Sequence, residues 1–377
     1  MKIGKLEFKE YAAKKPLAID DATGRYLTAR DIVERPALRL GSLLSLDTET
    51  RVKLAVERYK LEPEFTLGVI GMGLVTKDEA IAHLKNQTEF GQLALEAEMA
   101  HCSELMTALA GEIVPAWPVI PKTPLPRVPD WKPIKRCIIL KVPTRVLFCE
   151  NTTDSVTTPF ANYRMANVHP VFAAKGFSVV VLQGVDDVKA NFTPQAKNTL
   201  TVYISGIGHG SYTVYTGHAG NRILEACAYD SAEVKNKAIH FLSCQTAKTL
   251  GPDTVAKGAR AYAGYTENFI LQWDNSATPI DEFKLFAKCD STFDLSMAAG
   301  CTAQVAFNST VAAFNAAIAS VPGTVAASYL TWDRDHLKLH GDGNTTIASY
   351  RLVKVCFPMT ALERQAALLA AGELVTD

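Results

Sequence analysis

Short apolar runs rich in β-branched residues alternate with stretches of helical character from residue 135 onward. The apolar runs lie at residues 137–142, 145–149, 177–182, 200–205, 238–243 and 260–264, and helices are expected near residues 162–175 and 252–258. This alternation predicts an α/β fold in which helices cover both faces of a mostly parallel sheet. In such folds ligands bind at the carboxyl ends of the strands. Reactive side chains are therefore expected where the strands stop.

A cluster of prolines separates this region from the first part of the chain. Seven of the 18 prolines fall between Pro115 and Pro133, a density that excludes helix and favours extended backbone. We predict an accessory domain over residues 1–113, a proline-rich linker over residues 114–134 and a second domain over residues 135–377. The linker is interpreted as a spacer, with a docking segment as the alternative.

The first 112 residues are expected to be mainly helical. Thr76 and Glu79 form a capping-box pattern ahead of a helical apolar repeat over residues 80–109. A second helix is expected over residues 47–59, with Asp47 as its N-cap. No catalytic constellation occurs here, so this part is expected to regulate, to dock an activating protein partner or to cover the other half.

Charge and cysteine usage restrict the partners and the compartment. The 39 Lys and Arg residues balance 39 Asp and Glu residues, which argues against charge-driven binding to nucleic acid or anionic lipid. The first 19 residues lack the apolar core of a signal peptide, and no run of about 18 apolar residues predicts a membrane span. The eight cysteines form no CxxC pair, as is typical of reduced thiols in the cytoplasm.

Two of the predicted strands end in reactive side chains. Residues 201–208 lead into His209 and Gly210, and residues 239–243 lead into Cys244. A thiol beside an imidazole is the arrangement that nucleophilic cysteine catalysis requires, because the thiolate is the nucleophile. The backbone amides of Gly210 and Cys244 could stabilise an oxyanion.

These two blocks resemble the caspase-like (clan CD) cysteine peptidases, in particular the gingipain-type and CHAT branch. Residues 258–264 and 337–342 are similar to later elements of such domains, so the resemblance covers about residues 135–350. It implies a caspase-like domain that hydrolyses peptide bonds in a protein or peptide substrate. His209 would be the general base and proton donor, Cys244 the nucleophile, and Gly210 with Cys244 the oxyanion hole. No metal or organic cofactor is implied.

One departure from the family concerns the turn before His209. Relatives often have a longer polar stretch there, whereas Gly206 and Gly208 make this turn flexible. We therefore also consider an inactive resting geometry that a partner, a ligand or processing would order.

Other readings of the histidines and glycines are disfavoured. Residues 206–210 resemble part of a dinucleotide-binding loop, but the third glycine comes one residue early and residues 211–215 are β-rich. His336 and His340 have a zinc-ligand spacing for a helix, yet their surroundings alternate like a strand. His218 is a further candidate base, and His240 is interpreted as structural.

Substrate preference and activity stay open at this point. Four carboxylates lie near the strands that would build the substrate pocket and would favour a basic residue before the cleaved bond: Asp230, Glu267, Asp274 and Asp281. One alternative function is a catalytically inactive caspase-like interaction or scaffold protein. Another is acyl transfer to an amine with the same two residues.

Overall fold

The computed structural model describes residues 1–3, 5–20, 24–34, 43, 46–70, 72–110, 136–273 and 281–357. The linker predicted over residues 114–134 lies outside this range, so its interpretation stays a prediction. Among the described helices, none is both long and apolar enough to cross a bilayer.

A six-stranded sheet forms the centre of the fold and confirms the predicted α/β class. Five of its strands run parallel to one another, and the strand at one edge, formed by residues 337–341, runs antiparallel to its neighbour. In spatial order they are β17 (Leu337–Gly341), β15 (Ala261–Tyr265), β14 (Ala238–Leu242), β10 (Thr201–Ile207), β8 (Arg145–Glu150) and β9 (Ser178–Gln183). The carboxyl ends of the parallel strands therefore share one edge.

Helices cover both faces of this sheet because alternate strand residues point in opposite directions. On one face Leu147 and Ile204 pack with Phe192 of α7 (Lys189–Lys197). On the other face Val146 and Phe148 pack with residues of α6 (His169–Ala174) and α9 (Asp281–Ala298). The helices of this part are α5 (Thr157–Asn167), α6 (His169–Ala174), α7 (Lys189–Lys197), α8 (Leu250–Ala256), α9 (Asp281–Ala298), α10 (Ala303–Ser320) and α11 (Val325–His336).

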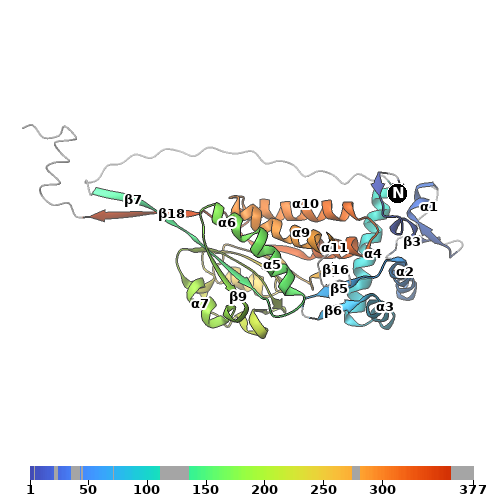
Figure 1. The fold of residues 1–377 in the computed structure, drawn as a ribbon, viewed down its shortest axis with the longest axis horizontal. Helices are drawn as coiled ribbons and strands as arrows, with labels where there is room; N and C mark the ends of the chain where they lie inside the picture. The colour runs from blue at the N-terminus through green and yellow to red at the C-terminus, as the bar shows by residue number, and fades with distance from the viewer. Residues whose placement is uncertain are drawn as a thin grey trace, which may run out of the picture.

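Two smaller β structures complete this part. A three-stranded antiparallel sheet of β11 (His209–Gly210), β12 (Val214–Thr216) and β13 (Arg222–Glu225) follows directly on β10. A ribbon of β7 (Arg136–Pro143) and β18 (Tyr350–Phe357) extends from the body at the end away from the N-terminal elements (Figure 1). Single-turn 3-10 helices lie at Ala12–Lys14, Gly184–Asp186, His218–Gly220 and Ser231–Glu233.

The N-terminal part contains the expected helices and, in addition, several short strands. The Asp47 side chain accepts a hydrogen bond from the Thr50 amide, and Thr76 with Glu79 forms the predicted capping box. The single helix expected over residues 80–109 is interrupted at Gln87, whose backbone is left-handed. The helices are α1 (Ala29–Glu34), α2 (Thr48–Leu61), α3 (Lys77–Asn86) and α4 (Glu89–Ala110). The strands are β1 (Lys2–Ile3), β2 (Leu6–Glu7), β3 (Pro16–Ile19), β4 (Tyr26–Thr28), β5 (Thr66–Val69) and β6 (Gly73–Thr76).

One strand pairing joins the N-terminal part to the central domain. The β5–β6 hairpin is extended by β16 (Ile270–Trp273), which pairs antiparallel with β5. Figure 1 shows β5, β6 and β16 side by side next to α11. Leu67 and Ile70 share one buried apolar cluster with Leu242 and Phe269. The N-terminal hairpin therefore packs against the sheet edge at which β14 ends.

Candidate active site

The strand register brings His209 and Cys244 to the same edge of the sheet. Ile207 of β10 lies opposite Leu242 of β14, so each reactive residue follows its strand's last paired residue by two positions. The Gly208 amide donates a hydrogen bond to the Leu242 carbonyl at 3.3 Å, which continues the pairing past the strand ends.

Gly210 packs against the turn that carries the thiol. A Cβ at this position would lie 2.1 Å from the Ser243 Oγ and 2.7 Å from the Cys244 carbonyl oxygen. Those separations are too short for any side chain. Glycine is therefore required here by close approach of two backbone segments, and the same approach places the two proposed oxyanion donors on neighbouring segments.

His209 is oriented by a carboxylate that the sequence analysis missed. Its Nε2 lies 2.8 Å from Oδ2 of Asp154, in the loop between β8 and α5. Because a carboxylate can only accept, Nε2 carries the proton and Nδ1 is left as the basic nitrogen. The Nδ1 atom is buried and has no hydrogen-bond partner among the described residues.

Asp154 is itself held by several donors. Its carboxylate accepts hydrogen bonds from the amides of Val156 and Thr157 and from the Thr157 hydroxyl. Partial burial opposes ionisation, but these bonds and that of His209 hold the pKa of Asp154 well below its ordinary value. Asp154 is thus a fixed anion beside the imidazole. No motif around Asp154 signals this role, since the contact spans 55 residues of chain.

The Cys244 thiol is covered by the N-terminal hairpin. The residue is 2% exposed, and its Sγ donates a hydrogen bond to the carbonyl oxygen of Ile70 at 2.9 Å. Burial raises the pKa of the Cys244 thiol to about 12. The group is therefore a neutral thiol at physiological pH. Among the described residues no hydrogen bond joins it to His209.

The turn after Cys244 is held by the loop that follows β15. Gln245 has a left-handed backbone with φ of 60°, and its amide donates to the Glu267 carbonyl at 3.1 Å. The Glu267 carboxylate lies 2.5 Å from Lys248 Nζ. Of the four proposed pocket carboxylates, Glu267 is thus the one whose contacts place it beside the thiol turn.

Of the other three pocket candidates, only Asp230 has a described side-chain environment. Asp230 lies in the loop before β14, where its carboxylate is 2.7 Å from Lys197 Nζ. That loop leads into the amino end of β14, at the sheet edge away from Cys244. Asp274 lies outside the described residues, and Asp281 is placed only as the first residue of α9.

Three further candidate histidines, His218, His336 and His340, lie in surroundings different from those of His209. His336 is the last residue of α11, not part of a strand as expected, and its Nδ1 donates to the Trp332 carbonyl. His340 lies in β17, where its Nε2 donates to the Ala247 carbonyl at 2.8 Å. His218 begins a 3-10 turn, and its amide donates to the Asp187 carbonyl. His336 and His340 thus each use one ring nitrogen in a hydrogen bond to a backbone carbonyl.

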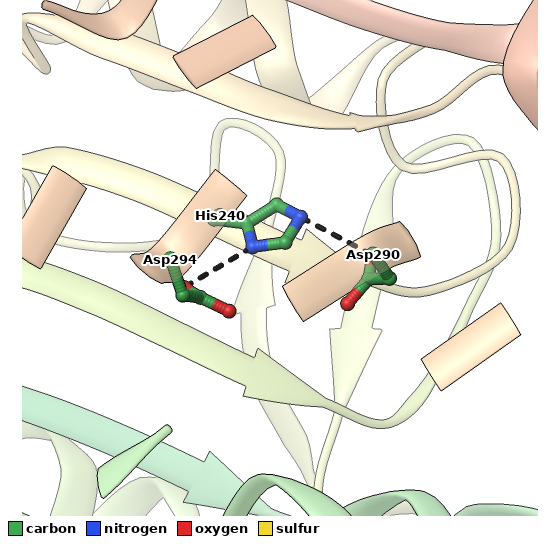
Figure 2. A group of neighbouring side chains, drawn as sticks. All are labelled: His240, Asp290 and Asp294. Atoms are coloured by element: carbon green, nitrogen blue, oxygen red, sulfur yellow. Dashed lines mark ion pairs between the residues drawn. The ribbon is translucent and has the colours of Figure 1, made fainter. Parts of the chain in front are cut away.

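A buried ionic cluster lies beneath the sheet, and it contains His240. Figure 2 shows the imidazole between two aspartates of α9, with Nε2 3.3 Å from Asp290 and Nδ1 3.2 Å from Asp294. Burial alone would lower the pKa of His240, but these two carboxylates raise it to about 9. The ring is therefore protonated on both nitrogens and offers no lone pair to a metal ion.

Further partners complete this cluster. Arg164 donates to Asp294 at 2.7 Å and to Glu150 at 3.0 Å, and the Tyr203 hydroxyl donates to the second oxygen of Asp294. Both oxygens of Asp294 are thus occupied by cationic or hydroxyl donors. Although His240, Asp290 and Asp294 have the spacing of a metal site, the donor set does not fit a metal ion. The cluster is an ion-pair network that ties α5 and α9 to the sheet.

Comparison with known proteins gives little at the level of sequence. No protein-family profile matches the chain, and no curated protein does. One of the solved structures that match is described as "Complex of Porphyromonas gingivalis RgpB pro- and mature domains". The match has a TM-score of 0.37 and 10% identity, and it covers 55% of this chain and 49% of that chain. The matched part thus spans about half of that chain, and a likeness of this size carries no information on activity.

Proposed function

We propose that the protein is a cysteine endopeptidase with Cys244 as nucleophile, His209 as general base and Asp154 as the residue that orients the imidazole. The observation that supports this most is the Asp154–His209 pair at 2.8 Å on the sheet edge where the Cys244 strand ends. A base oriented by a third group, close to a nucleophile, is the common arrangement of covalent catalysis.

In the proposed reaction Nδ1 of His209 takes the proton of the Cys244 thiol. The thiolate attacks the scissile carbonyl carbon, and the amides of Gly210 and Cys244 stabilise the oxyanion that forms. His209 then gives the proton to the leaving amine, and water hydrolyses the thioester with His209 as base again. Asp154 stabilises the imidazolium at each of these stages.

The proposed site is latent in the conformation described here. The thiol is buried, is neutral and donates to Ile70 instead of His209. Activation would require the β5–β6 hairpin to move away from the Cys244 turn. A protein partner, a ligand or processing that shifts the N-terminal part would therefore switch the enzyme on, as the sequence already suggested for residues 1–113.

The substrate is proposed to be a protein or peptide, with a basic residue before the cleaved bond as the expected preference. Glu267 is the carboxylate best placed for this role, although Lys248 already pairs with it. A basic substrate side chain would have to compete with Lys248 for that carboxylate. The proposed compartment is the cytoplasm, where thiols stay reduced.

The buried thiol also supports a second candidate function. If the hairpin never leaves Cys244, the protein is a catalytically inactive interaction or scaffold protein of the same fold. The two functions differ in whether Cys244 becomes reactive under any condition. Acyl transfer to an amine would use the same residues and differs from hydrolysis only in its product.

A library of peptides and a thiol-reactive peptide probe test the proposal directly. Wild type, Cys244→Ala and Ser243→Ala would be compared, because Ser243 is an equally buried neighbour in the same turn. We expect probe labelling and cleavage in wild type under activating conditions and in Ser243→Ala, but not in Cys244→Ala. Ile70→Ala would be included to loosen the cover. No labelling of Cys244 under any activating condition would favour the scaffold function, and an added amine in the products would indicate acyl transfer.

A further inference from the structure

A cavity lies at the edge of the central sheet opposite to the proposed active site. Its volume is about 610 Å³, and it is lined by residues at the amino ends of the parallel strands, including Thr201 of β10 and Ala238 of β14. Residues 345–348 and the first residues of β18, Tyr350 and Arg351, also line it. Because Cys244 lies at the carboxyl ends, this cavity is separate from the proposed active site. Its volume is within the range of small-molecule sites.

The charge of this cavity is strongly one-sided. None of its lining residues is acidic. Five cationic side chains line it: Lys197, Lys235, Lys237, Arg260 and Arg351. Lys197 is paired with Asp230. For Lys235, Arg260 and Arg351, the described part of the chain supplies no carboxylate within ion-pair distance. In a protein whose net charge is zero, this is a local concentration of uncompensated positive charge.

Two buried groups in the lining lack full complements of partners. Lys237 is 4% exposed, yet its ammonium donates only to the carbonyls of Ala232 and Lys235, both at 3.1 Å. An ammonium has three N–H donors, and buried charges are usually paired with an opposite charge. The Thr345 hydroxyl, in a residue that is 1% exposed, has no hydrogen-bond partner among the described residues. Both observations indicate that an acceptor group is missing.

We propose that this cavity binds a small anion that carries two or more phosphate groups. Guanidinium and ammonium groups are the usual partners of phosphate oxygens, and Arg260 and Arg351 can each donate two parallel hydrogen bonds. The hydroxyls of Thr199 and Thr345 add neutral donors. A concave site of this size fits a compact polyanion and not a nucleic-acid strand, which would follow an extended basic stripe. This inference does not rest on the proposed peptidase function.

Calorimetric titration of the full chain with inorganic tripolyphosphate tests the proposal, with sulfate at equal ionic strength as the reference anion. We expect tripolyphosphate to bind and sulfate to bind much more weakly. Arg260→Glu and Lys235→Glu, both at exposed positions, should each weaken binding about 10- to 100-fold, the value of a charged hydrogen bond. Lys85→Glu is the control, because it makes the same charge change on α3, outside the cavity lining.

Two further arms define the ligand and guard against misfolding. Adenosine triphosphate would bind as tightly as tripolyphosphate if only phosphates are recognised, and more tightly if Tyr350 in the lining stacks on the base. Thermal melting of each variant without ligand shows whether its fold is kept. Equal affinity for tripolyphosphate in Arg260→Glu, Lys235→Glu and Lys85→Glu, or equal binding of tripolyphosphate and sulfate to wild type, would overturn the proposal.

Discussion

The thiol of Cys244 donates its hydrogen bond to the backbone carbonyl of Ile70, 174 residues earlier in the chain, at 2.9 Å. The imidazole that should receive this proton is already oriented by Asp154. The proposed base, His209, is thus oriented for catalysis, whereas the proposed nucleophile, Cys244, donates its hydrogen bond to another group. The proposed site is therefore latent in this conformation. The hairpin that contains Ile70 is therefore the structural element on which activity would depend.

Alkylation kinetics can measure how well this hairpin protects Cys244. With a pKa of about 12, only about one Cys244 thiol in ten thousand is ionised at pH 8, and the sulfur is buried. Cys227 is exposed and serves as an internal reference. We expect iodoacetamide to label Cys227 well before Cys244, as followed by mass spectrometry of the two peptides.

Two cavity-forming substitutions distinguish the loss of the hairpin that covers Cys244 from a general loss of stability. Ile70→Ala removes apolar contacts beside the thiol, whereas Leu17→Ala makes a comparable cavity in β3 of the same apolar cluster. Each is expected to cost about 2–5 kcal/mol of unfolding free energy. Ile70→Ala should speed labelling of Cys244 far more than Leu17→Ala does. Equal rates in the two variants would mean that the hairpin gives no specific protection.

Replacing Asp154 tests the role of the orienting carboxylate. Asp154→Asn keeps the shape but removes the charge that fixes the proton on Nε2 of His209. For the activated enzyme we expect kcat to fall by about 10²- to 10⁴-fold with little change in KM, because the imidazolium and the tautomer lose their support. Asp186→Asn, in the 3-10 turn after β9, is a control at an exposed position. A kcat unchanged by Asp154→Asn would remove this residue from the mechanism.

The sequence predicted those features that depend on local patterns. Alternating apolar runs indicated the sheet, and Asp47 and Thr76 were recognisable as helix caps because a cap involves residues three positions apart. His209 and Cys244 could be placed together because each ends a strand. Neighbouring parallel strands bring such ends to one edge.

Features that depend on long-range contacts could not be predicted. The pairing of β5 with β16 joins segments about 200 residues apart, and no pattern within either strand specifies its partner. For the same reason the cover over Cys244 and the contact of Asp154 with His209 had no signal in the sequence. The strand expected over residues 335–340 begins only at Leu337, because a period of two over six residues is too short to exclude that its first residues form the last turn of a helix.

Gly210→Ala tests the close approach of the two proposed catalytic segments. The added methyl group would lie 2.7 Å from the Cys244 carbonyl oxygen, a backbone atom that can move only if the turn moves. We expect the strain to cost about 1–3 kcal/mol of unfolding free energy, and peptidase activity to fall by about 10²-fold or more. Gly220→Ala is the control, since nothing lies within 4 Å of its Cβ position and only its left-handed backbone is penalised. Full activity in Gly210→Ala would show that the two segments are not coupled in catalysis.

The ion-pair network beneath the sheet predicts a loss of stability at alkaline pH. The pKa of His240 is raised from an ordinary value of 6.5 to about 9 by Asp294 and Asp290. Because the folded-state pKa is the higher one, the stabilisation is complete below pH 6.5 and is lost as the pH rises through 9. The shift corresponds to about 3 kcal/mol of unfolding free energy.

Urea unfolding of wild type and His240→Asn between pH 6 and pH 9.5 measures this contribution. Other groups titrate in the same range, Lys237 among them with the opposite sign, but they are common to both proteins and cancel in the difference. We expect wild type to lose its advantage over His240→Asn as the pH rises from 6.5 to above 9. If the variant does not fold, the imidazole resonances of His240 in wild type provide the second measurement. An imidazole that loses its proton near pH 6.5, or two parallel stability curves, would show that the carboxylates of α9 do not hold His240 in its charged form.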